Sequence, residues 1–171
     1  KFTLTFAPTI QESAPLDDTF VRDSSPDNNH GDYSSLTTSY GTSHDARYPY
    51  IKLDMTNVVG SPLISEATLE LYVKDLDPAG MNINIYPVVS ESWFEDTVTW
   101  NTQPGYDTVD PIYTNLVIPP ESTWMTIDLT TFITEQAATP DSSASIAILP
   151  VENGGAAGLK TKFSSKEDVN V

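Results

Sequence analysis

Residues 66–76 read EATLELYVKDL, and this stretch decides the fold. Its apolar side chains stand at every second position, as Ala67, Leu69, Leu71 and Val73. Glu66, Thr68, Glu70 and Tyr72 stand at the alternate positions and face the opposite way in an extended chain. Period-two alternation is typical of a β-strand with one buried face and one solvated face. The stretch is therefore predicted to be a strand of an antiparallel sheet.

Similar strand patterns recur along the chain, separated by turn clusters rich in Gly, Pro, Asn and Asp. The other predicted strands of the body are 18–22, 34–40, 48–55, 81–89, 97–101, 123–130, 143–151 and 159–165. Short strands at this spacing indicate an all-β, jelly-roll-like antiparallel β-sandwich. The stretch TTFITEQAA at 130–138 predicts one short helix that ends before Pro140. Asp54 and Asp128 lie near strand ends, where we expect them to bond neighbouring backbone N–H groups.

The composition argues against several classes of function. The 171 residues fit one domain, or one domain with an arm. A formal charge of −16, from 24 Asp and Glu against 8 Lys and Arg, repels phosphate, so nucleic acid is not an expected partner. The sequence has no Cys and no apolar run of about 18 residues, which argues against disulfides and a membrane span. Abundant Thr, Ser, Asn and Pro are typical of extracellular all-β proteins, so we expect an extracellular or cell-surface location.

The first ten residues, KFTLTFAPTI, show a second clear alternation. Phe2, Leu4 and Phe6 alternate with small residues, which predicts a strand at the N-terminus. We therefore divide the chain into an N-terminal strand and arm at 1–14 and a β-sandwich domain at 15–171. A strand needs a neighbour for its backbone hydrogen bonds, and that neighbour lies either in the same chain or in another molecule.

Five segments resemble, in order, the DNRLRE-type domain, a family related to disaggregatase and also classed as an alginate-type carbohydrate-binding module. They are LDDTFVRDSSPDNNHGDYSSLTTSYG, RYPYIKLDMTNVVGSPLISEATLELYV, INIYPVVSESWFEDTVTWNTQPGYD, WMTIDLTTFITE and KFSSKE. The resemblance extends from about Asp17 to Glu167. It implies a jelly-roll-like β-sandwich, an exported location and no catalytic centre, and it is compatible with a bound calcium ion. Such domains are thought to bind polysaccharide or to hold a surface architecture.

The sequence departs from this family pattern at both ends, with an added strand at the front and no closing apolar strand after 159–165. A sandwich that lacks a strand exposes a groove, which a neighbour's extended segment can fill by donor-strand complementation. We therefore expect a non-enzymatic subunit of a pilus-like surface filament, a head-to-tail homopolymer. Its donor-strand anchors are Phe2, Leu4, Phe6 and Ile10. Two simpler alternatives are that the strand folds into its own sandwich, or that the C-terminus is cut short.

The loop SSPDNNHGD at 24–32 is a candidate calcium site, because Ca²⁺ takes six to eight oxygen ligands. The predicted ligands are Asp18, Asp23, Asp27, Asn29 and Asp32. The alternative is a turn rich in Asp and Asn that needs no metal.

A carbohydrate-binding module is the alternative function, and SWFEDTVTWN at 92–101 supplies its candidate site. Trp93, Glu95 and Tyr106 are the predicted contacts, since indoles stack on sugars and carboxylates accept sugar hydroxyls. The competing interpretation is that Trp93 is a core anchor. The net charge argues against direct binding of alginate unless Ca²⁺ bridges the two or a basic patch attracts it. Arg47, Lys52 and Lys74 are the candidates for that patch.

Catalysis has little support in the sequence. His30 and His44 both lie in polar loops, and no Gly-x-Ser-x-Gly, His-Glu-x-x-His or phosphate-loop motif occurs. We therefore expect the chain not to be an enzyme.

Overall fold

The fold is described from a computed structural model. It describes the chain except residues 7–8, 42–44, 59–63, 78–79, 152–157 and 171, and the side chains of 6–11 also lie outside the description. In the described part, eleven strands, one α-helix and one 3-10 helix are present. They are β1 (Phe2–Phe6), β2 (Thr9–Ser13), β3 (Asp17–Arg22), β4 (Ser35–Ser39), β5 (Arg47–Asp54), β6 (Ile64–Leu76), β7 (Asn82–Pro87), η1 (Trp100–Thr102), β8 (Tyr113–Val117), β9 (Trp124–Asp128), α1 (Thr130–Gln136), β10 (Ser143–Pro150) and β11 (Lys160–Ser164).

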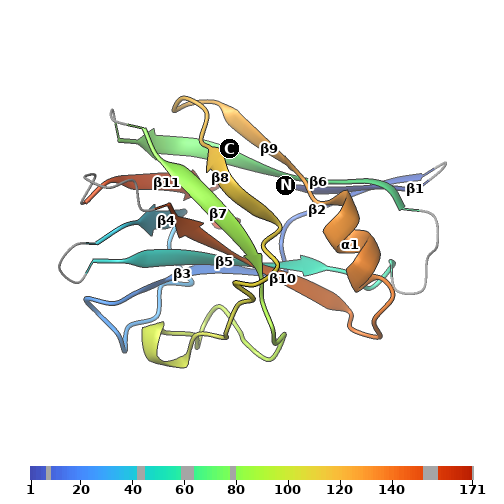
Figure 1. The fold of residues 1–171 in the computed structure, drawn as a ribbon, viewed down its shortest axis with the longest axis horizontal. Helices are drawn as coiled ribbons and strands as arrows, with labels where there is room; N and C mark the ends of the chain where they lie inside the picture. The colour runs from blue at the N-terminus through green and yellow to red at the C-terminus, as the bar shows by residue number, and fades with distance from the viewer. Residues whose placement is uncertain (7–8, 42–44, 59–63, 78–79, 152–157, 171) are drawn as a thin grey trace.

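The strands form a continuous antiparallel path that folds over on itself (Figure 1). The order is β2-β1-β6-β11-β4-β5-β10-β7-β8, with β3 added to β5 and β9 added to β6. The path turns between β4 and β5, which share the single residue pair Ser39 and Arg47. The two arms face each other across one hydrophobic core. The expected all-β fold with one short helix is confirmed.

The core consists of the inward-facing apolar residues of the predicted strands. The four apolar residues of 66–73 are buried, and so are Met125 and Ile127 of β9 and Ile83 and Ile85 of β7. Helix α1 closes one end of the sandwich, where Phe132 and Ile133 enter the core (Figure 1). Burial of alternate side chains on strands such as β6 and β9 explains why a polar, Thr-rich sequence still specifies a fold.

Strand β6 has three partners. One edge pairs with β9 at residues 68–72, and the other pairs with β1 at 64–69 and then with β11 at 73–76. Between β1 and β11, the backbone of Glu70 exchanges hydrogen bonds with the backbone of Lys1. The edge of β6 is thus shared by two strands that diverge near Tyr72, and this divergence positions the site described below.

The N-terminal strand pairs within its own chain. β1 lies between β2 and β6, with Leu4 opposite Ala67, and the side chains of Phe2 and Leu4 are each only 1% exposed. The apolar face of β1 therefore already has its place in the core, and the expected donation to a neighbouring molecule has no support. The side chains of Phe6 and Ile10, the other two predicted anchors, lie outside the described residues. Part of the expected arm is strand β2, because Thr9–Ser13 continue the hairpin.

Several local predictions are confirmed and several are corrected. Helix α1 begins at Thr130 as expected, and the side chains of Asp54 and Asp128 accept the backbone N–H groups of Thr56 and Thr130. The predicted strand at 97–101 is wrong, because those residues form a turn followed by η1. Strands β2 and β8 were not predicted. Among the described residues, no helix has the length and apolar character needed to cross a membrane.

Candidate functional site

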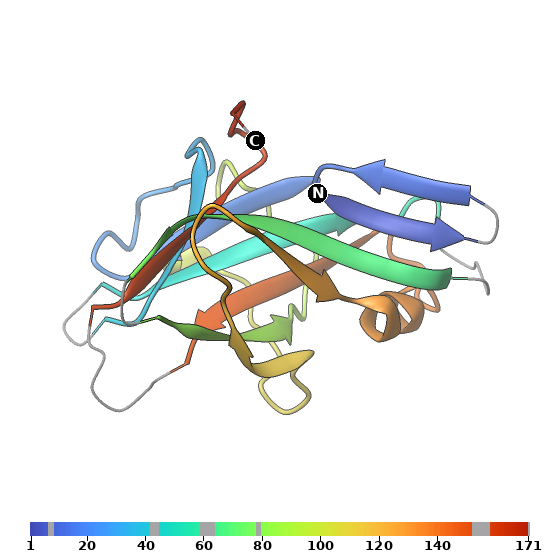
Figure 2. The same cartoon turned by 90° about the horizontal axis from the view of Figure 1, so that it is seen from above.

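A groove lies beside β6, where the strand that pairs with its edge changes from β1 to β11. Figure 2 shows the course of these three strands. Its volume is about 360 Å³, which suits a small ligand or one or two sugar rings of a longer chain. The walls come from Lys1 just before β1, from β2, β3, β5, β6 and β9, and from the end of β11 with the turn that follows it. The polar and aromatic lining residues include Lys1, Glu70, Tyr72, Trp124, Lys166 and Asp168.

Two aromatic side chains form one side of this groove. Trp124 begins β9 and pairs with Tyr72 on β6, and the two ring centroids are 5.3 Å apart with an interplanar angle of 65°. The indole of Trp124 is 49% exposed, because alternation along β9 turns Met125 into the core and Trp124 outward. Both rings also border an adjoining hollow with Lys74 and Ser122. An exposed, supported indole beside a groove offers a flat apolar surface.

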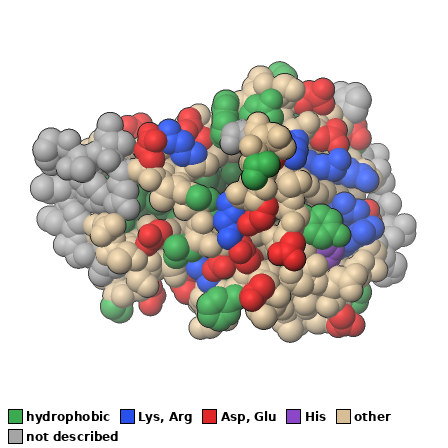
Figure 3. Space-filling view, turned by 180° about the vertical axis from the view of Figure 1, so that it is seen from behind, with side chains coloured by type: hydrophobic (Ala, Val, Ile, Leu, Met, Phe, Trp, Pro, Cys, Tyr) green, Lys and Arg blue, Asp and Glu red, His purple; other side chains and the backbone are tan. Residues whose placement is uncertain are grey.

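Charged side chains of both signs line the groove beside the aromatic pair. Figure 3 shows Lys and Arg side chains interspersed with Asp and Glu on the face seen from behind. The Lys1 ammonium contacts Glu12 at 2.8 Å, and Lys74 contacts Asp168 at 2.8 Å. The hydrogen bond from Lys74, joined by others from Ser164 and Asn170, lowers the pKa of Asp168 to about 2. These pairs hold hydrogen-bond donors and acceptors in fixed positions along the groove.

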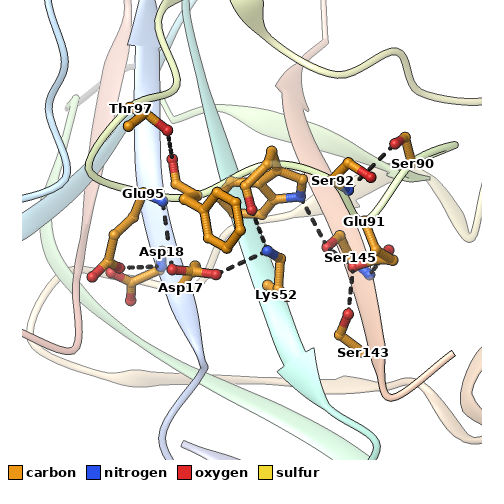
Figure 4. A network of polar contacts seen from close by, with 12 residues as sticks. Asp17, Asp18, Lys52, Ser90, Glu91, Ser92, Glu95, Thr97, Ser143 and Ser145 are labelled. Atoms are coloured by element: carbon orange, nitrogen blue, oxygen red, sulfur yellow. Dashed lines mark hydrogen bonds and ion pairs between the residues drawn. The ribbon is translucent and has the colours of Figure 1, made fainter.

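A cluster of three carboxylates lies beside the groove. Asp18 on β3, Glu95 in the loop after β7 and Glu167 in the turn after β11 each place one oxygen within 4.8 Å of the others. Figure 4 shows the Glu95 side chain reaching from that loop to the backbone N–H of Asp18, a hydrogen bond of 2.9 Å. Asp18 is 2% exposed, and burial raises the pKa of its carboxyl to about 7, with the Glu167 carboxylate adding to the effect. We call Asp18, Glu95 and Glu167 the carboxylate cluster.

Comparison with known proteins now identifies the kind of domain. The model of carbohydrate-binding module family 96 matches residues 9–170. The chain belongs to carbohydrate-binding module family 96. It is also 28% identical over 146 residues to a gellan lyase from Bacillus sp., a match that covers 84% of this chain but only 6% of that enzyme. The chain therefore corresponds to a small part of the lyase. The comparisons confirm a carbohydrate-binding module and give no support to the narrower DNRLRE label.

The family 96 module does not gather its predicted calcium ligands into one site. Asp27 accepts a hydrogen bond from Asn101, and Asp32 is exposed. The Asn29 side chain acts as a clip, since its amide donates to the carbonyls of Glu95 and Val98 and its oxygen accepts the N–H of Gly31. Asp23 directly follows β3, and one of its buried side-chain oxygens lacks a hydrogen-bond partner among the described residues. Of the five predicted ligands, Asp18 alone belongs to the carboxylate cluster.

The predicted sugar contacts Trp93 and Tyr106 do not lie in the groove either. Trp93 is 4% exposed and lies in a second hydrophobic cluster on the outer face of β5, with Tyr50 against its ring and the Lys52 ammonium 4.5 Å from its centroid. Its indole N–H donates to Ser145. The structure thus places Trp93 in a packed cluster rather than on a binding surface. Tyr106 is half-buried against Tyr86, away from the groove.

The predicted basic patch does not form either. Arg47 pairs with Asp45, Lys52 with Asp17 and Lys74 with Asp168, so each cation is neutralised by its own carboxylate. Sequence reasoning missed Trp124 and Tyr72 as site residues. The signal was available, because both are aromatic residues on the outward face of predicted strands, where a polar residue is usual.

Proposed function

We propose that this chain is an extracellular, non-catalytic module that binds polysaccharide, and that the groove beside Trp124 and Tyr72 is its binding face. The observation that carries the proposal is the half-exposed indole of Trp124 at the edge of a groove in a family 96 module. Carbohydrate-binding modules hold a polymer and leave its chemistry to other domains, which agrees with the absence of catalytic motifs in the sequence.

The groove offers both kinds of contact that a sugar ring needs. The apolar face of a pyranose, with its axial C–H groups, stacks on an indole, while its hydroxyls need hydrogen-bond partners at the ring edge. Trp124 supplies the flat surface and Tyr72 supports it from β6. The carboxylate of Glu70 and the ammonium groups of Lys166 and Lys1 line the same groove and supply acceptors and donors.

The ligand is a polysaccharide whose recognition does not depend on net charge. The chain carries a formal charge of −16, and the lysines of the groove are already paired with carboxylates. Attraction therefore comes from stacking and local hydrogen bonds, and long-range electrostatics opposes a polyanion. The related lyase makes gellan the first polysaccharide to test, and a neutral glucan is the appropriate second probe.

Affinity electrophoresis through gels that contain gellan or a neutral glucan tests this proposal. The wild-type module is expected to be retarded in at least one of these gels, and Trp124→Ala should weaken the retardation about tenfold or more. Phe94→Ala is the matched control, since Phe94 is an aromatic residue that is 61% exposed and does not line the groove. Circular dichroism checks that both variants are folded. Equal retardation of Trp124→Ala and wild type would refute the assignment of the groove.

A further inference from the structure

The carboxylate cluster brings together three acidic residues that are remote in sequence. Asp18, Glu95 and Glu167 come from the start of β3, from the loop between β7 and β8, and from the turn after β11. Like charges at such distances repel, so their convergence needs a compensating interaction. Lys166 provides one positive charge, with its ammonium 2.5 Å from Glu95 and 3.4 Å from Glu167. Three carboxylates and one ammonium leave a net charge of −2 when all four groups are ionised.

Two buried oxygens, one on Asp18 and one on Glu167, receive no hydrogen bond from an N–H or O–H donor among the described residues, and the two carboxyls lie within hydrogen-bonding reach of each other. One oxygen of Asp18 accepts the backbone N–H of Lys166 at 2.9 Å, but the other is buried and accepts no hydrogen bond. One oxygen of Glu167 is buried and unpartnered in the same way. A buried carboxylate oxygen without a donor costs free energy. Such a cost is relieved when a cation occupies the space between the oxygens.

The surrounding structure holds the three carboxylates in place. The loop that carries Glu95 is fixed by the Asn29 clip and by Gly31, where an added Cβ would clash with the Glu95 carbonyl. The Lys52 ammonium donates to the carbonyl of Trp93 in the same loop. The turn that carries Glu167 is fixed by Ser165, whose hydroxyl donates to the carbonyl of Tyr33. Ligands supported in this way do not pay much ordering entropy when an ion binds.

We propose that Asp18, Glu95 and Glu167 form a binding site for one divalent cation, of which Ca²⁺ fits best. All three side chains offer hard oxygen ligands, and none of them is the imidazole or thiolate that favours zinc. Oxygens at about 2.4 Å from a common Ca²⁺ ion are at most about 4.8 Å apart, and the three oxygens lie within that limit. Mg²⁺ demands near-ideal octahedral geometry, keeps several waters and usually takes one or two carboxylates, so a set of three protein carboxylates suits Ca²⁺ better.

The site differs from the loop site predicted from the sequence, since it uses Asp18 with two glutamates from other segments. Asp18 also lines the groove, so waters from that side can complete the coordination shell. The proposal stands independently of polysaccharide binding.

Calorimetric titration of the EDTA-stripped chain with CaCl₂, and separately with MgCl₂, tests the site. Wild type is expected to bind one Ca²⁺ per chain, with Mg²⁺ at least tenfold weaker, and to unfold at a higher temperature in Ca²⁺ than in EDTA. Asp18→Asn and Glu167→Gln should each weaken Ca²⁺ binding tenfold or more. Lys166→Met should strengthen it, since the ammonium competes with the ion. Glu135→Gln, an exposed change on α1, is the control and should behave as wild type.

Other results would overturn the site. If wild type gives no calcium heat and unfolds at the same temperature in Ca²⁺ and EDTA, no ion binds there. If Asp18→Asn fails to fold, Glu167→Gln still decides, because Glu167 lies in a half-buried turn. Binding that survives Glu167→Gln unchanged would place the ion elsewhere. A rise in the unfolding temperature of Asp18→Asn in EDTA, without any calcium effect on wild type, would mean that the carboxyls share a proton instead.

Discussion

Trp124 on β9 stands directly opposite Tyr72 on β6, and their rings meet edge to face with centroids 5.3 Å apart. The pair is held by the backbone ladder of two strands whose other faces are buried in the core. The indole therefore presents a fixed surface to the groove, and its support comes from Tyr72.

The Tyr72 ring should contribute to polysaccharide binding mainly through Trp124. We expect Tyr72→Ala to weaken binding about fivefold, because the indole loses its neighbour and gains rotamer freedom. The double variant with Trp124→Ala should be little weaker than Trp124→Ala alone, which a double-mutant cycle by calorimetry measures. Fully additive losses would mean that Tyr72 contacts the sugar on its own.

Trp93 should matter for stability and not for binding. Trp93→Ala removes a buried indole from the cluster with Tyr50 and is expected to cost about 3–5 kcal/mol of unfolding free energy. Urea denaturation measures that loss, and Phe94→Ala next to it should cost much less because Phe94 is exposed. Polysaccharide binding by the folded fraction of Trp93→Ala should be unchanged. Loss of polysaccharide binding in a folded Trp93→Ala variant would show that Trp93 contacts the sugar.

The first strand should behave as part of the core of its own chain. Leu4→Ala is expected to lower the free energy of unfolding by about 3 kcal/mol, since Leu4 packs opposite Ala67 beneath the sandwich surface. Thr3→Ala, on the other face of the same strand, is the control and should cost about 0.5 kcal/mol. Urea denaturation with size-exclusion chromatography provides the readout. An unchanged stability for Leu4→Ala, together with loss of polymers, would restore the donor-strand hypothesis.

Asp128 should stabilise the start of α1 in a pH-dependent way. Its carboxylate accepts the hydroxyl of Thr130 at 2.6 Å and the backbone N–H of the same residue at 2.9 Å, and these bonds lower the pKa of Asp128. A carboxyl whose pKa is lower in the folded state stabilises the fold above its unfolded pKa of about 3.9. That stabilisation disappears as the pH falls through the lower folded value.

Asp128→Ala should therefore cost about 0.5 kcal/mol at pH 7, because water screens this exposed carboxylate, and the cost should shrink at pH values below about 4. Urea denaturation at several pH values measures the difference from wild type. Asp141→Ala, an exposed change shortly after α1, serves as the control. A penalty that stays constant down to pH 2 would show that the charge of Asp128 has no role.

The sequence predicted the features that depend on local alternation. The core face of 66–73, the start of α1 and the turns capped by Asp54 and Asp128 all follow from neighbouring residues, and all are confirmed. Strand β8 was not predicted because Pro111 and Pro119 lie on either side of it and Asn115 adopts a positive φ of 58°. The stretch at 97–101 alternates like a strand, but it follows a loop that packs on the outer face of β3 and β5.

The residues of the candidate site could not be predicted, because tertiary contacts between distant segments bring them together. The loop at 24–32 was predicted to bind calcium because its acidic residues are close in sequence. The carboxylate cluster instead consists of residues 18, 95 and 167, which are close only in the folded chain. Trp93 and Trp124 look alike in sequence. Only the packing of the 90–99 loop against Tyr50 distinguishes the buried indole from the exposed one.

The shared strand β6 also governs how the module opens. Because β6 hydrogen-bonds with β9, β1 and β11, it holds these strands of one arm together, and its amides should exchange with solvent only on global unfolding. The β1–β2 hairpin attaches to the body through β6, so it is the segment that can fray first. Its departure removes one wall of the groove. A polymer that binds across the groove should therefore hold the hairpin in place. Binding of the polymer can then be detected as slower amide exchange in β1.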